Sequence, residues 1–361
     1  MTNAKLIGLS SVQHFLVDGL CICSMFLLAE IYGDRFGAYG DRVSIGAILT
    51  YNVLAFVSQP LTGMMADRMK ARHWLLIASS LLLTLAVVCA SLIQTLMAVS
   101  PNLMWDGLGE WLLILVAILL GVGNSLFHVW GGKQTVVMTG NDIRALGVFV
   151  STGVLGLAIG LICRSWPLLY GLMLAYVAVA IVYLRSDVIS RNEEGGMRNE
   201  NSLAADQTTP GPSYSGGEKT QYGNLIPLST FHFSLILLLT LMLFVCCRSF
   251  VGEVFSREIT KTQDLILLIA VGSMLGKMAG GWIARWIGIW RSLAVILAGV
   301  ALCFVFGDYF EMVLLVGIFL MNCTMPITLY LANILLPRRE GLAFGLLAAA
   351  LIPGYLLAVY W

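Results

Sequence analysis

Charged residues are scarce in this chain of 361 residues, where Lys, Arg, Asp and Glu together make up 11%. Soluble globular domains carry about a quarter of their residues charged, so this composition excludes a freely soluble protein. The net charge is only +1, which excludes the strongly basic surface that nucleic-acid binding requires. We therefore expect no nucleic-acid partner.

Groups of metal-ligating or catalytic residues are also missing from the sequence. It has four His and eight Cys, and the cysteines fall inside apolar stretches without the spacing of a zinc site. The sequence therefore predicts no metal, no cofactor and no enzymatic activity. A membrane enzyme is a distant alternative, in which His14, Asp18 and His128 are the only candidate reactive groups.

What the sequence has in abundance is long apolar runs, and hydrophobic residues make up 59% of it. About 20 apolar residues cross a bilayer as one helix. The sequence predicts an all-α polytopic membrane protein with two pseudo-symmetric helix bundles and about eleven, or twelve, transmembrane helices. The expected spans are 6–29, 43–65, 74–97, 110–135, 143–163, 167–184, 228–250, 263–284, 289–307, 311–336 and 341–361.

A polar stretch divides the chain into two parts. Residues 1–184 are expected to form an N-terminal six-helix bundle and residues 225–361 a C-terminal bundle of about five helices. Residues 185–224 contain almost no apolar run, so we expect a flexible cytoplasmic linker with little structure.

The distribution of Lys and Arg predicts how the chain is oriented. If the N-terminus is cytoplasmic, all but six of the 21 basic residues lie on or toward the inner side, as the positive-inside rule requires. We therefore expect a multi-pass protein of the cell (inner or plasma) membrane with a cytoplasmic N-terminus. The six exceptions are Arg35, Arg42, Arg164, Arg248, Arg257 and Lys261.

Two short turns between apolar runs are related to each other. The run from Gly63 to Arg72 is charged, and a weaker copy from Gly281 to Gly288 follows 218 residues later. Internal repeats of this kind are typical of secondary transporters, whose binding site lies between the two halves. Other matches in the same order are Ser11, His14 and Phe15 with Ser229, His232 and Phe233, and Gly121 and Leu146 with Gly317 and Leu342.

The first turn also resembles a known loop. The run from Gly63 to Arg72 is similar to the cytoplasmic loop between helices two and three of the major facilitator superfamily, and the likeness to that superfamily extends over the whole chain. It implies two bundles that rock to give alternating access. A looser resemblance to the fosmidomycin-resistance branch rests on His14-x-x-x-Asp18, Phe127-His128, Arg248-Ser-Phe and Pro337-x-x-x-Gly341-Leu-Ala-Phe-Gly345.

Three residues are candidates for proton coupling. Asp18 lies near the middle of the first span, where a carboxylate costs about 2.5–3.5 kcal/mol on insertion scales. His14 lies one helical turn earlier on the same face, and histidine titrates near neutral pH. His128 in the fourth span is the third candidate. The alternative is that these side chains only hydrogen-bond neighbouring helices.

Arg248, Asn322 and Tyr330 are candidate substrate-binding residues. The guanidinium of Arg248 suits an anionic group such as a carboxylate or phosphonate. It has two alternatives, which are snorkelling to the outer headgroups and an ion pair with Glu253. Lys277 is expected to snorkel to the cytoplasmic surface.

The charged turn is the candidate gate. The resemblance implies that Asp67 holds the second helix against the eleventh, and the unpaired amides near Gly341 at the start of that helix attract an anion. Arg285 replaces the acid in the second turn and is not expected to form the same contact. The alternative is that the charges only fix topology. The gating residues are Gly63, Asp67, Arg68, Arg72, Arg144 and Gly341.

These observations predict a monomeric secondary transporter whose partners are a small-molecule substrate, protons and the lipid bilayer. The favoured function is export of a small, anionic or amphiphilic compound in exchange for protons. Proton-coupled uptake by symport is the alternative. A non-transporting membrane receptor or a truncated transporter is more distant, because no twelfth helix is found.

Overall fold

The computed structural model describes residues 3–69, 73–99, 107–205, 228–259, 263–307 and 311–360. These residues form helices and short connections, with no strand among them. Eleven of the helical segments are long and apolar enough to cross a membrane. The predicted all-α membrane fold is thus confirmed, because each long apolar run satisfies its backbone hydrogen bonds within one helix.

Each half of the chain forms one group of helices. The first half contains α1 (Asn3–Phe36), α2 (Ala38–Asn52), the π-helix η1 (Val53–Val57), α3 (Gln59–Arg68), α4 (Trp74–Val99), α6 (Gly109–Thr139), α7 (Ile143–Ile162) and α8 (Trp166–Ala205). The second half contains α9 (Leu228–Ile259), α10 (Gln263–Ile287), α11 (Ile289–Phe306), α12 (Glu311–Leu335), α13 (Glu340–Ala349) and α14 (Leu351–Tyr360).

The structure differs from the predicted spans at three places. The second span is interrupted by η1, with Pro60 at the start of α3, and the last span is divided at Ala350. The helix α8 continues to Ala205, although little structure is predicted from residue 185. A helix that extends from a membrane span needs no new nucleation, which explains this continuation. The rest of the predicted linker, from residue 206, lies outside the described residues.

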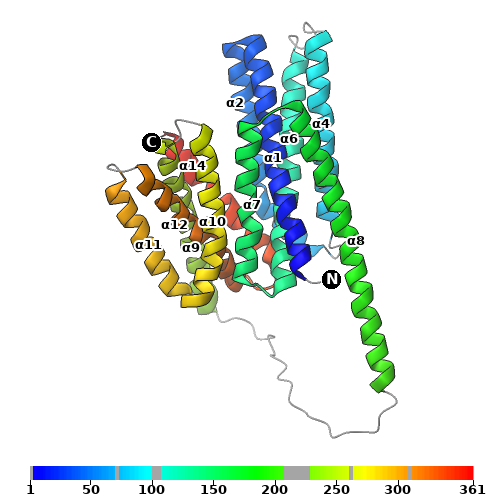
Figure 1. Cartoon of the computed structure of the whole chain (residues 1–361), viewed down its shortest axis with the longest axis vertical. Coiled ribbons are helices and arrows are strands. Elements are labelled where there is room, and N and C mark those ends of the chain that lie inside the picture. The colour runs from blue at the N-terminus through cyan, green and yellow to red at the C-terminus, as the bar shows by residue number, and fades with distance from the viewer. Residues whose placement is uncertain are drawn as a thin grey trace.

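The packing of helices recurs between the two halves. In the first half α1 packs on α7 and α4 on α6, and in the second half α9 packs on α14 and α11 on α12. The halves meet mainly where α3 packs on α13 and α7 packs on α10. Both contacts lie at the end of the molecule where α1 begins, here called the N-terminal side, and Figure 1 shows the C-terminus toward the opposite side.

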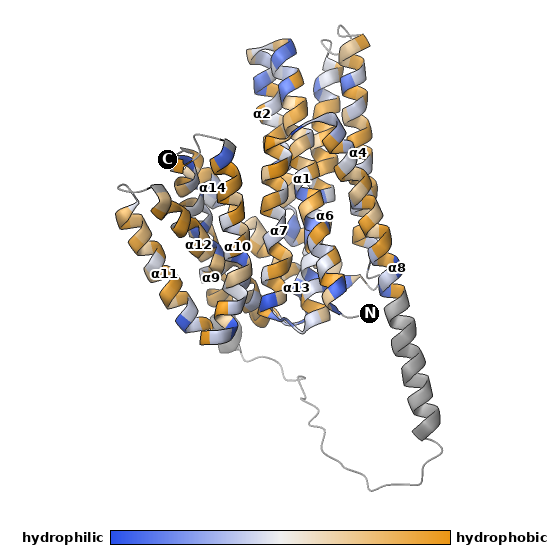
Figure 2. Ribbon diagram, viewed as in Figure 1, coloured by the Kyte–Doolittle hydropathy of each residue, from blue (hydrophilic) through white to orange (hydrophobic). Residues whose placement is uncertain are grey.

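The outside of the bundles is apolar. Figure 2 shows hydrophobic residues along most of the helices and hydrophilic ones gathered near the helix ends. Several Trp side chains near helix ends are largely exposed, as in the aromatic belts of membrane proteins. They include Trp74 and Trp286 on the N-terminal side and Trp111 on the opposite side. Polar side chains that are buried at mid-span are therefore the places to look for function.

Candidate functional site

Three titratable side chains meet in the middle of the first bundle. His14 and Asp18 project from α1 and His128 from α6, and all three are buried. The Nε2 atoms of the two histidines are 2.9 Å apart. The Asp18 carboxylate lies 3.3 Å from Nε2 of His14 and 3.4 Å from Nε2 of His128. The structure thus brings the three predicted proton-coupling residues together, and we call them the His–Asp–His cluster.

The other ring nitrogens fix the tautomers of this cluster. Nδ1 of His14 lies 2.8 Å from the carbonyl oxygen of Phe149 on α7, and Nδ1 of His128 lies 3.0 Å from that of Asn124. A carbonyl only accepts, so each Nδ1 carries a hydrogen and donates it. In a neutral ring Nε2 is then a lone pair. Two lone pairs and a carboxylate that face one another repel, so at least one additional proton must lie between them.

Neighbouring groups hold Asp18 in this position. The amide of Asn124 donates to a carboxylate oxygen of Asp18 at 3.3 Å and to the hydroxyl of Tyr51, also at 3.3 Å. On the other side lies Gly153 of α7, where a Cβ atom would collide with both Asp18 and His14. The close approach of α1 to α7 therefore depends on this glycine.

The cluster also meets the loose distance requirement for a metal site, because its ligand atoms lie within 4.8 Å of one another. Two imidazoles on one tetrahedral metal, with ligand distances of about 2.0–2.1 Å, place their nitrogens about 3.3 Å apart. The observed Nε2–Nε2 distance of 2.9 Å is that of a hydrogen bond between nitrogens. A shared proton therefore fits this arrangement better than a metal ion does.

The second bundle carries two cationic side chains at mid-span. Arg248 of α9 is only 8% exposed, and its guanidinium has one long hydrogen bond of 3.5 Å to the hydroxyl of Thr328 on α12. The proposed partner Glu253 instead pairs with Arg257, at 3.3 Å. Lys277 of α10 does not snorkel, since it interacts electrostatically with Asp18, His128 and Arg248 at the centre of the molecule.

The three predicted substrate-binding residues are not brought into one site. Asn322 on α12 donates to the hydroxyl of Ser273 on α10, at 3.2 Å, and so joins two helices of the second bundle. Tyr330 lies farther along α12, on the N-terminal side, where its carbonyl accepts a hydrogen bond of 3.2 Å from Asn141. Lys277 is the residue that sequence reasoning placed wrongly, because depth from a helix end does not show which neighbours enclose a side chain.

Asp67 joins the two bundles on the N-terminal side. Its two carboxylate oxygens each accept a hydrogen bond of 2.9 Å, one from the amide of Gly341 and one from that of Leu342. These amides belong to the first turn of α13, which has no intrahelical partner for them. Lys133 of α6, which the sequence reasoning did not select, supports the carboxylate at 3.1 Å.

The contact between α3 and α13 is close, because the glycines at positions 63 and 341 lie against each other. A Cβ atom at Gly63 would collide with the carbonyl of Gly341. Among the other predicted gating residues, Arg68 ends α3 and Arg144 lies at the start of α7. Arg72 lies outside the described residues.

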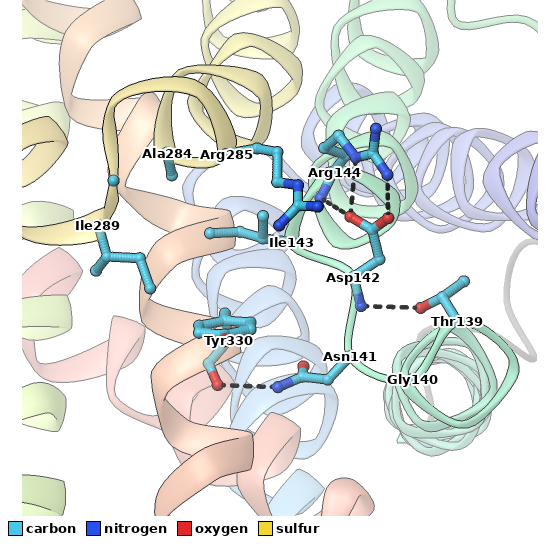
Figure 3. Close-up of a pocket in the computed structure, with 11 residues that line it drawn as sticks. Thr139, Gly140, Asn141, Asp142, Ile143, Arg144, Ala284, Arg285, Ile289 and Tyr330 are labelled. Atoms are coloured by element: carbon cyan, nitrogen blue, oxygen red, sulfur yellow. Dashed lines mark hydrogen bonds and ion pairs between the residues drawn. The ribbon is translucent and has the colours of Figure 1, made fainter.

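A polar pocket of about 490 Å³ marks the second contact between the bundles, at α7 and α10. Asp142 caps α7 by accepting from the amide of Arg144, and its carboxylate also pairs with the guanidinium of Arg144 at 2.6 Å. Figure 3 shows Arg285 of α10 extending toward Asp142. The hydrogen bonds from Arg144 lower the pKa of Asp142 below its ordinary value, and the charge of Arg285 contributes in the same direction.

The two contacts between bundles are thus related but reversed in charge. Asp67 and Arg285 occupy equivalent positions in the two turns, 218 residues apart. In the first contact the acid caps a helix of the other bundle, whereas in the second contact α7 is capped by its own Asp142. Arg285 therefore faces an acid rather than free amides, which explains why a base is present in the second turn.

Comparisons with known proteins point to one family. A family model described as Major Facilitator Superfamily matches residues 11–359. A comparison with curated protein sequences gave no significant match. The fold is similar to that of several solved transporters, each at low sequence identity.

Three of these structures illustrate the similarity. The human organic anion transporter MFSD10 has a TM-score of 0.61 at 14% identity, covering 100% of this chain and 95% of that one. The Escherichia coli fucose:proton symporter FucP has a TM-score of 0.55 at 14% identity, covering 98% and 90%. A bacterial homologue of the iron transporter ferroportin, in the outward-facing state, has a TM-score of 0.54 at 16% identity, covering 98% and 91%.

Proposed function

Because the chain belongs to the major facilitator superfamily, it is a membrane transporter rather than an enzyme, and we propose that it is a secondary transporter driven by protons through the His–Asp–His cluster. It carries a small molecule between its two bundles by alternating access. The narrower resemblance to the fosmidomycin-resistance branch stays a prediction.

The observation that carries this proposal is the 2.9 Å contact between Nε2 of His14 and Nε2 of His128. With both Nδ1 atoms donating to carbonyls, one proton makes one ring an imidazolium that can donate to the other ring and to Asp18. Loss of that proton leaves facing lone pairs beside a carboxylate. Binding and release of the proton therefore change the packing of α1 against α6.

Gating follows from the two contacts on the N-terminal side. In this conformation Asp67 caps α13 and the Asp142 region faces Arg285, so this side is closed. Substrate release to this side requires both contacts to break as the bundles rock. We propose that this side is cytoplasmic, as the distribution of basic residues predicts.

The proton site is tested directly with the purified protein. The chain has four His, so nitrogen NMR of histidine-labelled protein resolves few signals. We expect a pair of coupled Nε2 signals that share a proton near neutral pH and disappear in His128→Gln. Separate signals from two independent neutral rings would contradict the proposal, as would one tightly bound metal ion per chain in elemental analysis.

Coupling is tested in liposomes with an internal pH dye and a panel of small carboxylates, phosphonates and neutral compounds. We expect at least one compound to produce a proton flux in the wild-type protein that is abolished in Asp18→Asn. Asp41→Asn, at an exposed position on α2, is the matched control and should retain the flux. Export by exchange and uptake by symport give opposite signs of flux. Substrate movement that ignores an imposed pH gradient would overturn the coupling.

A further inference from the structure

Charge is distributed unequally between the two bundles at mid-span. Asp18 is the only acid there, since every other acidic residue whose side chain the structure describes lies within two turns of the end of a candidate span or outside the spans. The second bundle has two basic residues near the middle of their spans, Arg248 on α9 and Lys277 on α10. This bundle therefore holds buried positive charge with no acid of its own.

The surroundings of Arg248 do not compensate its charge. Its side chain lines a groove of about 450 Å³ between α9, α11 and α12, whose other lining residues are apolar except for Cys247. Its one hydrogen bond is to the neutral hydroxyl of Thr328. A guanidinium has five donors and stays charged, so most of its donors lack an acceptor among the described residues. An unpaired buried charge of this kind is costly.

Lys277 is in a similar position. No hydrogen bond or ion pair joins its ammonium to the described residues. The charged and titratable groups that interact with it are Arg248 on α9, Asp18 on α1 and His128 on α6. The helix α7 contributes the glycine at position 147, which lies against the carbonyl of Lys277. Asp18 is shared with two histidines, so it compensates Lys277 only in part.

We infer that Arg248 and Lys277 together bind an oxyanion group, carboxylate or phosphonate, on the transported compound. This inference rests on the proposed transport function, and it assigns the substrate class. The planar fork of Arg248 can bind two oxygens at once, and Lys277 adds a second charge from the neighbouring helix. Buried ionisable groups at mid-membrane are characteristic of substrate pathways in transporters.

The position of Lys277 also links the anion to the proton. Lys277 lies between Arg248 and the His–Asp–His cluster in electrostatic terms, because it interacts with both. Its charge opposes a positive charge on the cluster, and a bound anion cancels that opposition. The anion therefore strengthens proton binding, and by linkage the proton strengthens anion binding equally. Ligands that bind together are carried together, so this arrangement favours proton–anion symport over exchange.

Binding is tested with methylphosphonate and propionate as probes and propionamide as the neutral isostere. Thermal unfolding of the purified protein should be raised by the two anions and not by the amide. Arg248→Gln and Lys277→Gln should each weaken anion binding at least about tenfold. Both variants should unfold at the same or a higher temperature than the wild type without ligand, because each removes an unpaired buried charge. Arg257→Gln, which removes an exposed cation from the same helix, is the control and should bind normally.

Three outcomes would overturn the assignment. The first is no stabilisation of the wild type by either anion, the second is equal stabilisation by propionamide, and the third is unchanged binding in both Gln variants. If the Gln variants are instead strongly destabilised without ligand, the cations are structural and the assignment is wrong. Arg248→Lys should restore part of the anion affinity, which a structural role for the guanidinium does not predict.

Linkage is tested by adding the anion to weakly buffered protein near neutral pH. The wild type should take up protons as the anion binds, and Asp18→Asn should bind the anion without this uptake. Proton release on binding would overturn the symport inference. Anion binding without any flux in response to a pH gradient would contradict the proposed function, whereas a pH-driven flux of neutral compounds alone would contradict only the anion site.

Discussion

At the scale of single residues, the His–Asp–His cluster depends on the absence of a side chain at Gly153. A Cβ atom there would collide with Asp18 and His14. We expect Gly153→Ala to cost about 1–3 kcal/mol through overpacking and to broaden or shift the shared-proton signals in histidine NMR. Gly171→Ala on α8 is the matched control, because nothing lies within 4 Å of its added Cβ. Equal unfolding temperatures for the two variants would contradict this account of the cluster.

Asp142 predicts how the second contact between bundles responds to pH. Hydrogen bonds from Arg144 lower the pKa of Asp142, so the folded protein gains stability that is present above the ordinary carboxyl pKa of about 3.9. This stability is lost as the pH falls through the lowered pKa. Spin labels on α7 and α10 should therefore keep one distance between pH 5 and 8 and separate only below about pH 4. A change in distance near pH 6 would show that another group controls this contact.

At the scale of elements, the N-terminus of α13 depends on a carboxylate from the other bundle. Removing an N-cap costs about 0.5–2 kcal/mol, so Asp67→Asn should increase the population that is open on the N-terminal side, by about tenfold at 1.4 kcal/mol. The measurement is cysteine labelling from that side at a position in α13. Arg68→Gln, next in sequence, is the control. Unchanged labelling in Asp67→Asn would mean that the carboxylate does not hold the gate.

Sequence alone predicts the helices well and their interruptions poorly. The length of each apolar run specifies a span, and helical spacing puts His14 and Asp18 on one face. The π-helix Val53–Val57 and the division at Ala350 arise where neighbouring helices and prolines compete with regular hydrogen bonding, which hydropathy does not register. The pairing of His128 with α1, and the enclosure of Lys277, depend on how the helices are rotated within each bundle. Tyr330 was misplaced for the same reason.

At the scale of the whole molecule, two distant contacts hold one side closed. If the bundles rock as rigid bodies, both contacts break in a single step. Free-energy effects of Asp67→Asn and Arg285→Gln on the open population should then add within about 0.5 kcal/mol. The populations of the two single variants and the double variant are measured by distances between spin labels on the two bundles. A double variant no more open than either single variant would show that one contact alone controls the motion.

The trans cap on α13 has a consequence for the role of solvent. When Asp67 leaves the amides of Gly341 and Leu342, water molecules become their only ready acceptors, so the closed state is the drier one. Lowering the water activity with an excluded polymer or sugar should therefore slow opening in proportion to osmolality, and the number of waters taken up per cycle follows from that slope. In this protein hydration acts as a reactant in the transport cycle.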